Sequence, residues 1–553
     1  RYLSAYGHDD ERLTWEMECI DAVHASGYPM VRSFFLSQLQ YIGTKRSAEF
    51  AAGFLTDEKM CEPAVAVISS CDYSGKEDML AMSLQLKSLP CAAAVINELA
   101  RMKSDKAVEE YLSWYRNGGA DIRAAALNAL AESAHEDAYK TLSGAAADAS
   151  YGWDPAGASA ALVQYAWNMG AKGDVQTMER ICREVLTNAA VQYRTAALEA
   201  MVHHMGYEAI NYLLSGFLSE DIEYRIAILR LANDIPGIAA TRKWIDLLPD
   251  LDYMRKAEII QMLGDRGDML AAEPIRNSLY CPSAELRTTA AMALARLQGR
   301  ESVQELIDYL RSYETADDQV AAYVALKTLV DSRRRDMIAR ALEGSSDNAK
   351  AIMLVLLAEG GENRFFNTLL GYTSSADPKL RAVAFSGLRN LAGQANQQEL
   401  IDLLLSTSGR TETANVQLAL AAAANKISNK QERADKVLKA MKKSAQKEKF
   451  MPVLAMLGGE EALKAVKEEF DRGRAEMRAV AFDALAEWSD HEAHIILFDI
   501  CASGNKNYSE RAFYAYVDKV SGAPLPDAGK LKLLEKIMPY AFTDEQKSTL
   551  QDR

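Results

Sequence analysis

Apolar residues recur three and four positions apart in one short stretch, Met477 to Trp488, and close copies of that stretch return along the chain. Read as a helix, this stretch carries one apolar stripe, made of Met477, Val480, Ala481, Ala484, Leu485 and Trp488. Most side chains on the stripe are small. The pattern therefore predicts a helix that packs closely against another helix along one face.

The copies of this helix begin at Ile122, Tyr193, Tyr224, Leu286 and Leu380, and an arginine follows each of these residues directly. Equivalent positions recur about every 32 residues, a period typical of repeats built from one helix pair. A stack of repeats also explains how a chain of 553 residues lacks an obvious linker, because each repeat needs to bury surface only against its neighbours. We expect roughly sixteen helix pairs.

The residues at the start of the second helix indicate which repeat this is. The Trp and Gly-Tyr signature of tetratricopeptide repeats and the TPLHxA of ankyrin repeats are both absent. In the copy at Leu380, Asp377 is placed to cap the helix and Pro378 to occupy its first turn. This start resembles that of a short HEAT-like repeat. We therefore predict an all-α, right-handed α-solenoid, a superhelix of HEAT-like helix pairs.

The regularity of the repeats predicts two regions. Residues 1–104 read as irregular helix pairs that cap the N-terminal end, and residues 105–553 read as the regular HEAT-like solenoid. The last repeat stops in mid-pattern, so we expect the solenoid to be truncated at its C-terminal end. Any signal peptide would lie outside this sequence, which begins at Arg1.

The arginine at the start of the second helix is predicted to be structural. We expect its guanidinium group to reach an acidic residue of an adjacent loop, which would tie neighbouring repeats together. This arginine ladder consists of Arg123, Arg194, Arg225, Arg287, Arg381 and Arg478.

Charge argues against several classes of partner. The net charge is −14, so nucleic acid and anionic membranes are not expected to attract the chain. The most basic stretch, Lys426 to Lys449, and the run from Arg333 to Arg335 are interpreted as solvated surface. No run of apolar residues is long enough to span a bilayer.

Candidate chemistry is sparse. The seven cysteines show no CxxC and no even framework. We interpret most of them as small buried hydrophobes, and they leave the redox compartment open. His491 and His494 are three residues apart, but the sequence offers them no evident third ligand, and the adjacent His203 and His204 should point to different faces. We expect no metal, no cofactor and no catalytic residue in this chain.

One segment interrupts the repeat. Between Gly144 and Ala160 a longer loop replaces a tight turn and supplies several aromatic side chains and a carboxylate. The candidate ligand surface, an aromatic platform suited to a sugar or a peptide, consists of Tyr151, Trp153, Asp154, Tyr165 and Trp167. The alternative is structural: Trp153 folds back to cover the gap that the missing arginine leaves.

Two segments carry a more particular resemblance. The first segment lies between Tyr151 and Val202 and contains YGWDPAGASAALVQYAWNMGAKGD and RTAALEAMV. The second is formed by the final repeats and contains RAVAFDALAEWSD, SERAFYAYVDKVSG and PDAGKLKLLEKIMPYAFTDEQKSTL. Both segments resemble the HEAT-repeat region of exported proteins from Bacteroidota. Those proteins carry a separate C-terminal 3-keto-disaccharide hydrolase-like domain. This chain has no segment of alternating strands, so no catalytic residue of that domain is transferred to it.

These observations lead to one functional expectation and two alternatives. We expect a non-catalytic scaffold that binds a protein or peptide on its concave face, and the resemblance implies a periplasmic or secreted protein that acts on carbohydrate through another domain. The first alternative is a stand-alone cytoplasmic adaptor. The second is a glycan-binding or glycan-processing site between Tyr151 and Trp167.

Overall fold

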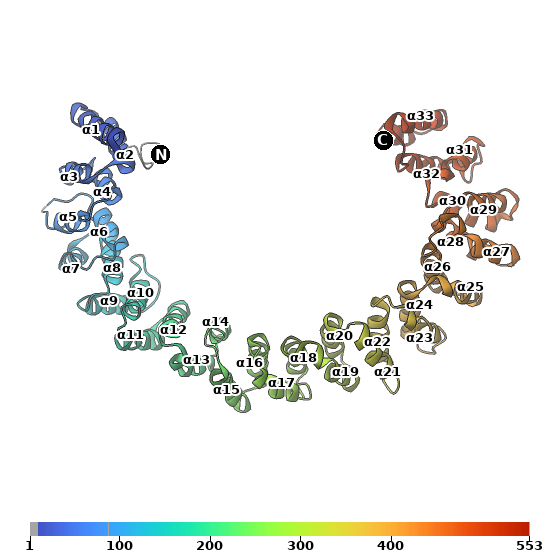
Figure 1. The fold of residues 1–553 in the computed structure, drawn as a ribbon, viewed down its shortest axis with the longest axis horizontal. Helices are drawn as coiled ribbons and strands as arrows, with labels where there is room; N and C mark the ends of the chain where they lie inside the picture. The colour runs from blue at the N-terminus through green and yellow to red at the C-terminus, as the bar shows by residue number, and fades with distance from the viewer. Residues whose placement is uncertain (1–8, 87, 552–553) are drawn as a thin grey trace. The chain divides into compact units, whose positions relative to one another are not determined.

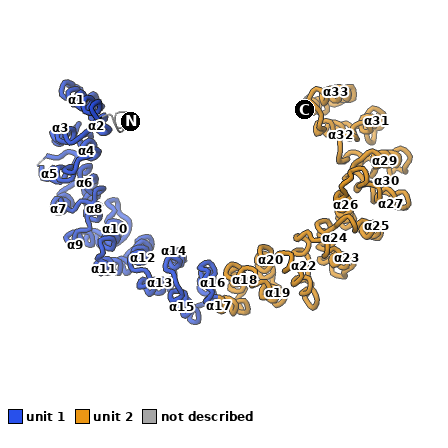
Figure 2. The backbone as a smooth tube through the Cα atoms, in the orientation of Figure 1, with its two compact units in different colours: residues 1–271 blue, residues 272–553 orange. Residues whose placement is uncertain are grey.

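The computed structural model describes residues 9–86 and 88–551, and α-helices dominate this part of the chain, which contains no β-strand (Figure 1). The chain divides into two compact units, residues 1–271 and residues 272–553 (Figure 2). Within each unit, antiparallel helix pairs follow one another, so the all-α solenoid predicted from the period is confirmed. No helix in the described ranges combines the length and apolar character needed to cross a membrane.

In the first unit, odd-numbered helices open the pairs and even-numbered helices close them. The opening helices are α1 (Asp9–Ala25), α3 (Lys45–Ala52), α5 (Lys76–Ser83), α7 (Val108–Asn117), α9 (Ala138–Asp148), α11 (Val175–Asn188), α13 (Ile210–Phe217) and α15 (Ile238–Leu247). The closing helices are α2 (Pro29–Ile42), α4 (Cys61–Ser70), α6 (Ala92–Arg101), α8 (Ala120–Ser133), α10 (Ala158–Ala171), α12 (Val191–Met205), α14 (Ile222–Ala232) and α16 (Tyr253–Arg266).

The second unit continues the same order. Its opening helices are α17 (Ala272–Ser278), α19 (Val303–Ser312), α21 (Ser332–Ala341), α23 (Phe366–Tyr372), α25 (Gln397–Ser406), α27 (Asp435–Lys443), α29 (Glu460–Arg472), α31 (His494–Ala502) and α33 (Asp527–Ile537). Its closing helices are α18 (Ala284–Gln298), α20 (Ala316–Leu329), α22 (Asp347–Glu359), α24 (Pro378–Leu391), α26 (Arg410–Asn425), α28 (Met451–Leu457), α30 (Ala475–Ala486), α32 (Ser509–Ser521) and α34 (Asp544–Gln551).

The core lies between the two helices of each pair and between the closing helices of successive repeats. In each unit every closing helix packs against the next one along the chain, as α6 does against α8 and α18 does against α20. Alanine makes this close approach possible, and the buried face of α18 includes Ala290, Ala291 and Ala293. Because α6 and α8 lie on either side of residues 104 and 105, helix packing continues directly across that point.

Polar side chains begin the closing helices. The Asp377 carboxylate accepts a hydrogen bond from the Leu380 backbone N–H at 2.8 Å, with Pro378 in the first turn of α24, as the sequence predicted. Asp221, Ser283 and Thr315 cap α14, α18 and α20 in the same way. These caps fix where each closing helix starts and hence where its arginine lies.

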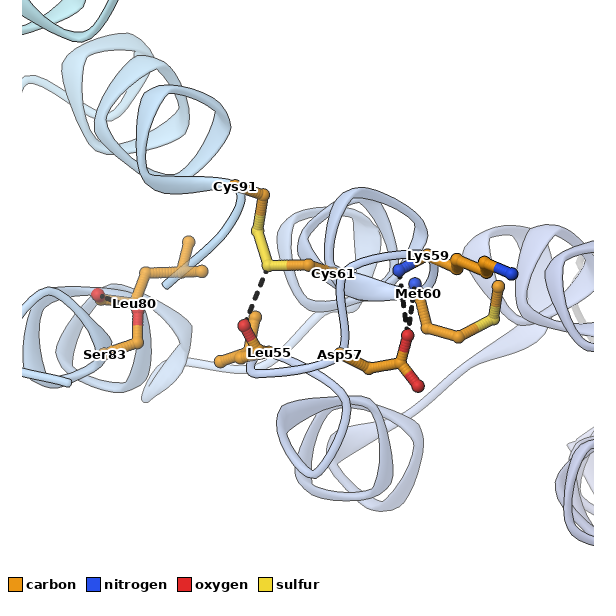
Figure 3. The surroundings of a disulfide bond; sticks show 8 residues. All are labelled: Leu55, Asp57, Lys59, Met60, Cys61, Leu80, Ser83 and Cys91. Atoms are coloured by element: carbon orange, nitrogen blue, oxygen red, sulfur yellow. Dashed lines mark hydrogen bonds between the residues drawn. A yellow bond between two sulfur atoms is a disulfide. The ribbon is translucent and has the colours of Figure 1, made fainter. Parts of the chain in front are cut away.

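A disulfide bond links two closing helices of the first unit. Cys61, the first residue of α4, is bonded to Cys91, which directly precedes α6, with 5.7 Å between the two Cα atoms (Figure 3). Cys61 and Cys91 are therefore exceptions to the interpretation of most cysteines as small buried hydrophobes. Their separation of 30 residues, close to one repeat, brings both helix starts to equivalent places in adjacent repeats.

The other cysteines are free, and most of them are packed in the core. Cys19, Cys71, Cys182 and Cys501 are buried, which confirms the sequence interpretation for these four residues. Burial raises the pKa of the Cys182 thiol to about 12, so that thiol stays protonated and unreactive at neutral pH.

Candidate interaction site

The loop from Ala149 to Gly157 connects α9 to α10 and begins with strained backbone. Ser150 and Tyr151 both have φ of 52°, a left-handed conformation that costs a non-glycine residue about 1 kcal/mol or more. Hydrogen bonds from the backbone N–H groups of Ser150 and Tyr151 to the carbonyls of Ala147 and Ala146, both 2.8 Å, close the end of α9. The chain then leaves the helix in a fixed direction.

Tyr151 holds the start of the loop against the next repeat. Its hydroxyl donates a hydrogen bond to Glu184 on α11 at 2.8 Å, and the hydroxyls of Tyr139 and Ser143 on α9 donate to the same carboxylate at 2.8 and 2.6 Å. Burial, together with the adjacent Glu184 carboxylate, raises the pKa of Tyr151. Sequence reasoning missed Glu184, because its partners lie between 33 and 45 residues earlier in the chain.

The carboxylate of Asp154 is hydrogen-bonded to backbone N–H groups. Its two carboxylate oxygens accept hydrogen bonds from the N–H groups of Ala156 at 2.9 Å and Ala158 at 2.8 Å, and Ala158 is the first residue of α10. Ser159 donates its hydroxyl to the Gly152 carbonyl at 2.8 Å. The carboxylate that the sequence offered to a ligand therefore shapes the loop instead.

Trp153 extends from this hydrogen-bonded loop into solvent. The side chain is 77% exposed, so it does not fold back over the neighbouring repeat, and the structural alternative for Trp153 is wrong. Met30 and Phe542 are exposed to a similar degree, at 86% and 77%, so what distinguishes Trp153 is the loop that carries it rather than its exposure alone.

The remaining two platform residues lie elsewhere. Tyr165 is fully buried and donates its hydroxyl to the His135 carbonyl at 3.0 Å. Trp167 is half-buried, and its ring is stacked on His203 with 4.8 Å between ring centroids. The predicted five-residue platform is therefore not formed, because α10 turns Tyr165 into the core and Trp167 toward α12.

His203 and His204 are closer together than the sequence indicated. Both rings contact Trp167, and their own centroids are 4.7 Å apart, so the expectation that the two side chains point to different faces is wrong. Burial first, and then the adjacent His203, lower the pKa of His204. This aromatic cluster joins α10 to α12.

Two ladder arginines, Arg225 and Arg287, are buried and form ion pairs. Arg287 donates from Nε and Nη2 to Asp318 on α20 at 3.0 and 2.7 Å, and Arg225 makes the same two-pronged contact with Glu258 on α16 at 2.8 and 2.7 Å. The Nη1 group of each arginine donates to two carbonyls in the loop that precedes its own helix. The acidic partner is thus on the next closing helix rather than in a loop.

The other ladder arginines differ among themselves. Arg381 donates to the carbonyls of its preceding loop and lies 3.8 Å from Glu412. Arg478 donates to the carbonyls of Phe470 and Gly473, Arg194 lies over the ring of Tyr224 with 4.4 Å to its centroid, and Arg123 is exposed.

The basic stretch from Lys426 to Lys449 and the pair His491 and His494 are partly solvent-exposed and partly hydrogen-bonded to backbone carbonyls. Most lysines of the basic stretch are exposed, but Lys449 donates to the carbonyls of Leu404, Leu405 and Thr407. The rings of His491 and His494 are 6.1 Å apart, and Nδ1 of His494 lies 2.6 Å from the His491 carbonyl. Among the described residues, no group of three His, Cys, Asp or Glu side chains is arranged to hold a metal ion.

Comparisons with known proteins give only structural matches of low similarity. No family model and no curated protein matches the chain. The structure of Kap121p is 11% identical and matches 100% of this chain and 74% of its own, with a TM-score of 0.41. Importin beta is 11% identical over 97% of this chain and 90% of its own, with a TM-score of 0.33. Human deoxyhypusine hydroxylase is 16% identical, covers 47% of this chain and 99% of its own, and has a TM-score of 0.22.

The class of the protein is defined by its own helix pairs. Closing helices packed in sequence, a period near 31 residues between paired side chains, and capped starts with an arginine identify an α-solenoid of HEAT-like repeats.

Proposed function

We propose that the chain is a non-catalytic interaction scaffold that binds a protein or peptide through Trp153. One observation carries the proposal: a tryptophan that is 77% exposed lies on a loop that the side chains of Tyr151, Asp154 and Ser159 anchor by hydrogen bonds within the protein. Tryptophan is enriched among the side chains that dominate the energy of protein interfaces. A rigid loop also loses little conformational entropy when a partner binds.

A protein or peptide suits this loop better than a sugar does. Sugar sites usually combine an aromatic face with free polar groups, and both oxygens of Asp154 are already used by the backbone. Trp153 alone supplies an apolar face, which fits an apolar pocket or groove on a partner. A glycan remains the alternative occupant of the same loop.

Export of the protein is the second part of the proposal. The disulfide between Cys61 and Cys91 supports it, because disulfides persist in oxidising compartments and are rare in the cytosol of mesophiles. The resemblance to HEAT-repeat regions of exported carbohydrate-active proteins points the same way. In this proposal, the scaffold serves a carbohydrate-active domain in the same polypeptide.

Crosslinking in the source cells tests the partner. A photoreactive amino acid at position 153 is expected to yield an adduct with a discrete protein, whereas the same group at Ile238, which is 62% exposed in the same unit, is expected to yield none. Equal adducts at both positions, or none at either, would contradict the role of Trp153. A glycan panel that binds the native chain but not Trp153→Ala would favour the sugar alternative.

Fractionation of the same cells tests export. The polypeptide that contains Met477 to Trp488 is expected in the periplasm or at the surface, with a mass above 60.9 kDa. A cytoplasmic polypeptide near that mass, with Cys61 and Cys91 reduced, would replace the exported scaffold with a stand-alone adaptor.

A further inference from the structure

A second surface with distinct chemistry lies between two opening helices of the second unit. Helices α19 and α21 belong to adjacent repeats and contact each other, and a groove of about 930 Å³ is present between them. That volume is at the upper end of the range for specific ligand sites. Five arginines line the groove, against two carboxylates.

Three of the five arginines make no ion pair within the described residues. Arg311 on α19, and Arg333 and Arg340 on α21, are exposed. The other two lining arginines share Asp331: Arg334 lies 2.8 Å from its carboxylate and Arg300 3.7 Å from it. The groove therefore holds positive charge that the protein does not neutralise.

The two walls of the groove have the same period. Gln304 and Arg311 are seven residues apart on α19, and Arg333 and Arg340 are seven residues apart on α21. Seven residues are about two turns, or roughly 10 Å along a helix axis, so each pair lies on one face. Gln304 donates hydrogen bonds to Asp308, which lies one turn further along α19 and does not line the groove, at 3.1 and 3.2 Å.

An apolar strip separates the charged positions on α21. Met337 lies one turn after Arg333 and Ala341 one turn after Met337; both line the groove and are half-buried. A ligand in the groove would therefore meet arginine, then methionine, then arginine along one wall. This order matches a helix that carries acidic residues two turns apart with an apolar residue between them.

The carboxylates in the groove argue against a continuous polyanion. Asp336 pairs with Arg364 of the next repeat at 2.7 Å, and Glu301 is exposed at the start of the groove. A nucleic acid strand would bring phosphates past both groups and be repelled there. A peptide helix can place carboxylates opposite the arginines and neutral residues opposite Glu301 and Asp336.

We propose that the groove between α19 and α21 binds an acidic amphipathic helix of a partner protein, whose carboxylates pair with Arg311, Arg333 and Arg340. The planar guanidinium group suits this ligand, because it donates two parallel hydrogen bonds to one carboxylate. Met337 contacts the apolar stripe of the bound helix. The residues of this site belong to the second unit, whereas Trp153 belongs to the first.

Fluorescence anisotropy with the whole chain tests the site directly. The probe is a labelled helical peptide whose glutamates recur every seven residues beside a leucine stripe. We expect saturable binding that weakens as salt is added, and about a tenfold or greater loss of affinity in the double variant Arg333→Ala/Arg340→Ala. Replacing glutamate with glutamine in the peptide should have the same effect.

A charge-matched control separates this groove from a general basic surface. Lys436→Ala/Lys439→Ala removes two exposed cations from α27 in the same unit and should leave the affinity unchanged, as should Trp153→Ala. Similar losses in both double variants would overturn the proposal. Tighter binding of a single-stranded oligonucleotide of equal charge to the same arginines would overturn it in favour of nucleic acid.

A folding control keeps the result interpretable. Both double variants should show the same circular dichroism as the native chain, because the four side chains replaced are exposed. The single variant Arg311→Ala, which changes the opposite wall, should also weaken binding of the peptide. Unchanged affinity in Arg311→Ala and in Arg333→Ala/Arg340→Ala alike would also overturn the proposal.

Discussion

Arg287 and Asp318 are 31 residues apart, about one repeat, and their side chains meet between α18 and α20. The Asp318 carboxylate also accepts hydrogen bonds from the hydroxyls of Tyr309 and Thr315 at 2.5 and 2.6 Å. Every charged atom of this pair therefore has a partner, which is the condition under which a buried ion pair is tolerated.

Removing one partner of this pair should be costly. Arg287→Ala leaves the Asp318 carboxylate buried without its cation and is expected to destabilise the repeat by about 3–5 kcal/mol. Arg123→Ala is the matched control, because that ladder arginine is exposed, and it should change stability by no more than about 0.5 kcal/mol. Amide exchange in α18 and α20, and in α8 for the control, measures both effects. Equal losses of protection in the two variants would show that the Arg287–Asp318 pair stabilises its repeat no more than an exposed arginine does.

The same pair predicts how stability responds to acid. Burial on its own would raise the pKa of Asp318, but hydrogen bonds from Arg287, Thr315 and Tyr309 outweigh it and hold this pKa below its ordinary value. A lowered pKa means that the contribution is fully present above about pH 4 and is lost as the pH falls through the folded-state value. The protection of α20 amides, relative to their intrinsic exchange rates at each pH, should therefore fall on acidification more in the native chain than in Asp318→Asn. Parallel pH profiles would contradict this.

At the scale of helices, cations of one repeat close the ends of helices in the previous one. Lys172, which follows α10, donates to the carbonyls of Ser133 and Ala134 at the end of α8, at 2.7 and 3.1 Å. Arg266 on α16 donates to the Ala232 carbonyl at the end of α14 at 2.6 Å. Positive charge is favourable there because helix C-termini expose unpaired carbonyls. These contacts link repeats without using the apolar core.

The disulfide performs the same linking role at the starts of α4 and α6. It closes a loop of about 30 residues, for which the chain-entropy estimate is about 3–4 kcal/mol of stabilisation. Dithiothreitol should therefore lower the urea midpoint of the native chain. The double variant Cys61→Ser/Cys91→Ser should start at the lower midpoint and show no response to dithiothreitol. A native chain insensitive to the reductant would show that the bond contributes nothing to stability.

Across the whole molecule, charge is distributed unevenly. Nearly all of the net negative charge lies in residues 1–271, whereas acidic and basic residues almost balance in residues 272–553. The arginine groove of α19 and α21 therefore lies in the unit whose own net negative charge weakens the positive potential of the groove least. The first unit, which carries Trp153, repels polyanions, so its interactions should depend on apolar contact.

The sequence predicted the repeated helices because apolar spacing, caps and period all agree within each copy. It could not rank the ladder arginines from their own positions. The information lies one repeat later, where an acid at Asp318, Glu258 or Glu412 provides a partner and Tyr224 provides a ring for Arg194. Comparing each ladder arginine with the residues about one repeat later would have distinguished the arginines that form ion pairs from those that do not.

The candidate site was predicted only in part, for a different reason. Trp153 lies in a loop, where helical periodicity gives no information, and its exposure depends on how Tyr151 and Asp154 anchor the backbone. Tyr165 is in the middle of α10, and the helical phase that buries it is set by packing against α8. Local pattern therefore located the unusual loop but did not determine which of its side chains face solvent.

The central claim is tested most directly by purifying the partner that is crosslinked at position 153 and measuring its affinity for three chains: the native chain, Trp153→Ala and Ile238→Ala. We predict that Trp153→Ala weakens that affinity by about 2 kcal/mol or more, roughly thirtyfold, because exposed tryptophans at interfaces act as anchors. Ile238→Ala should bind as the native chain does, since Ile238 is also exposed in the first unit but lies outside the loop. Equal affinity of all three chains would contradict the account of this solenoid as a scaffold that binds through Trp153.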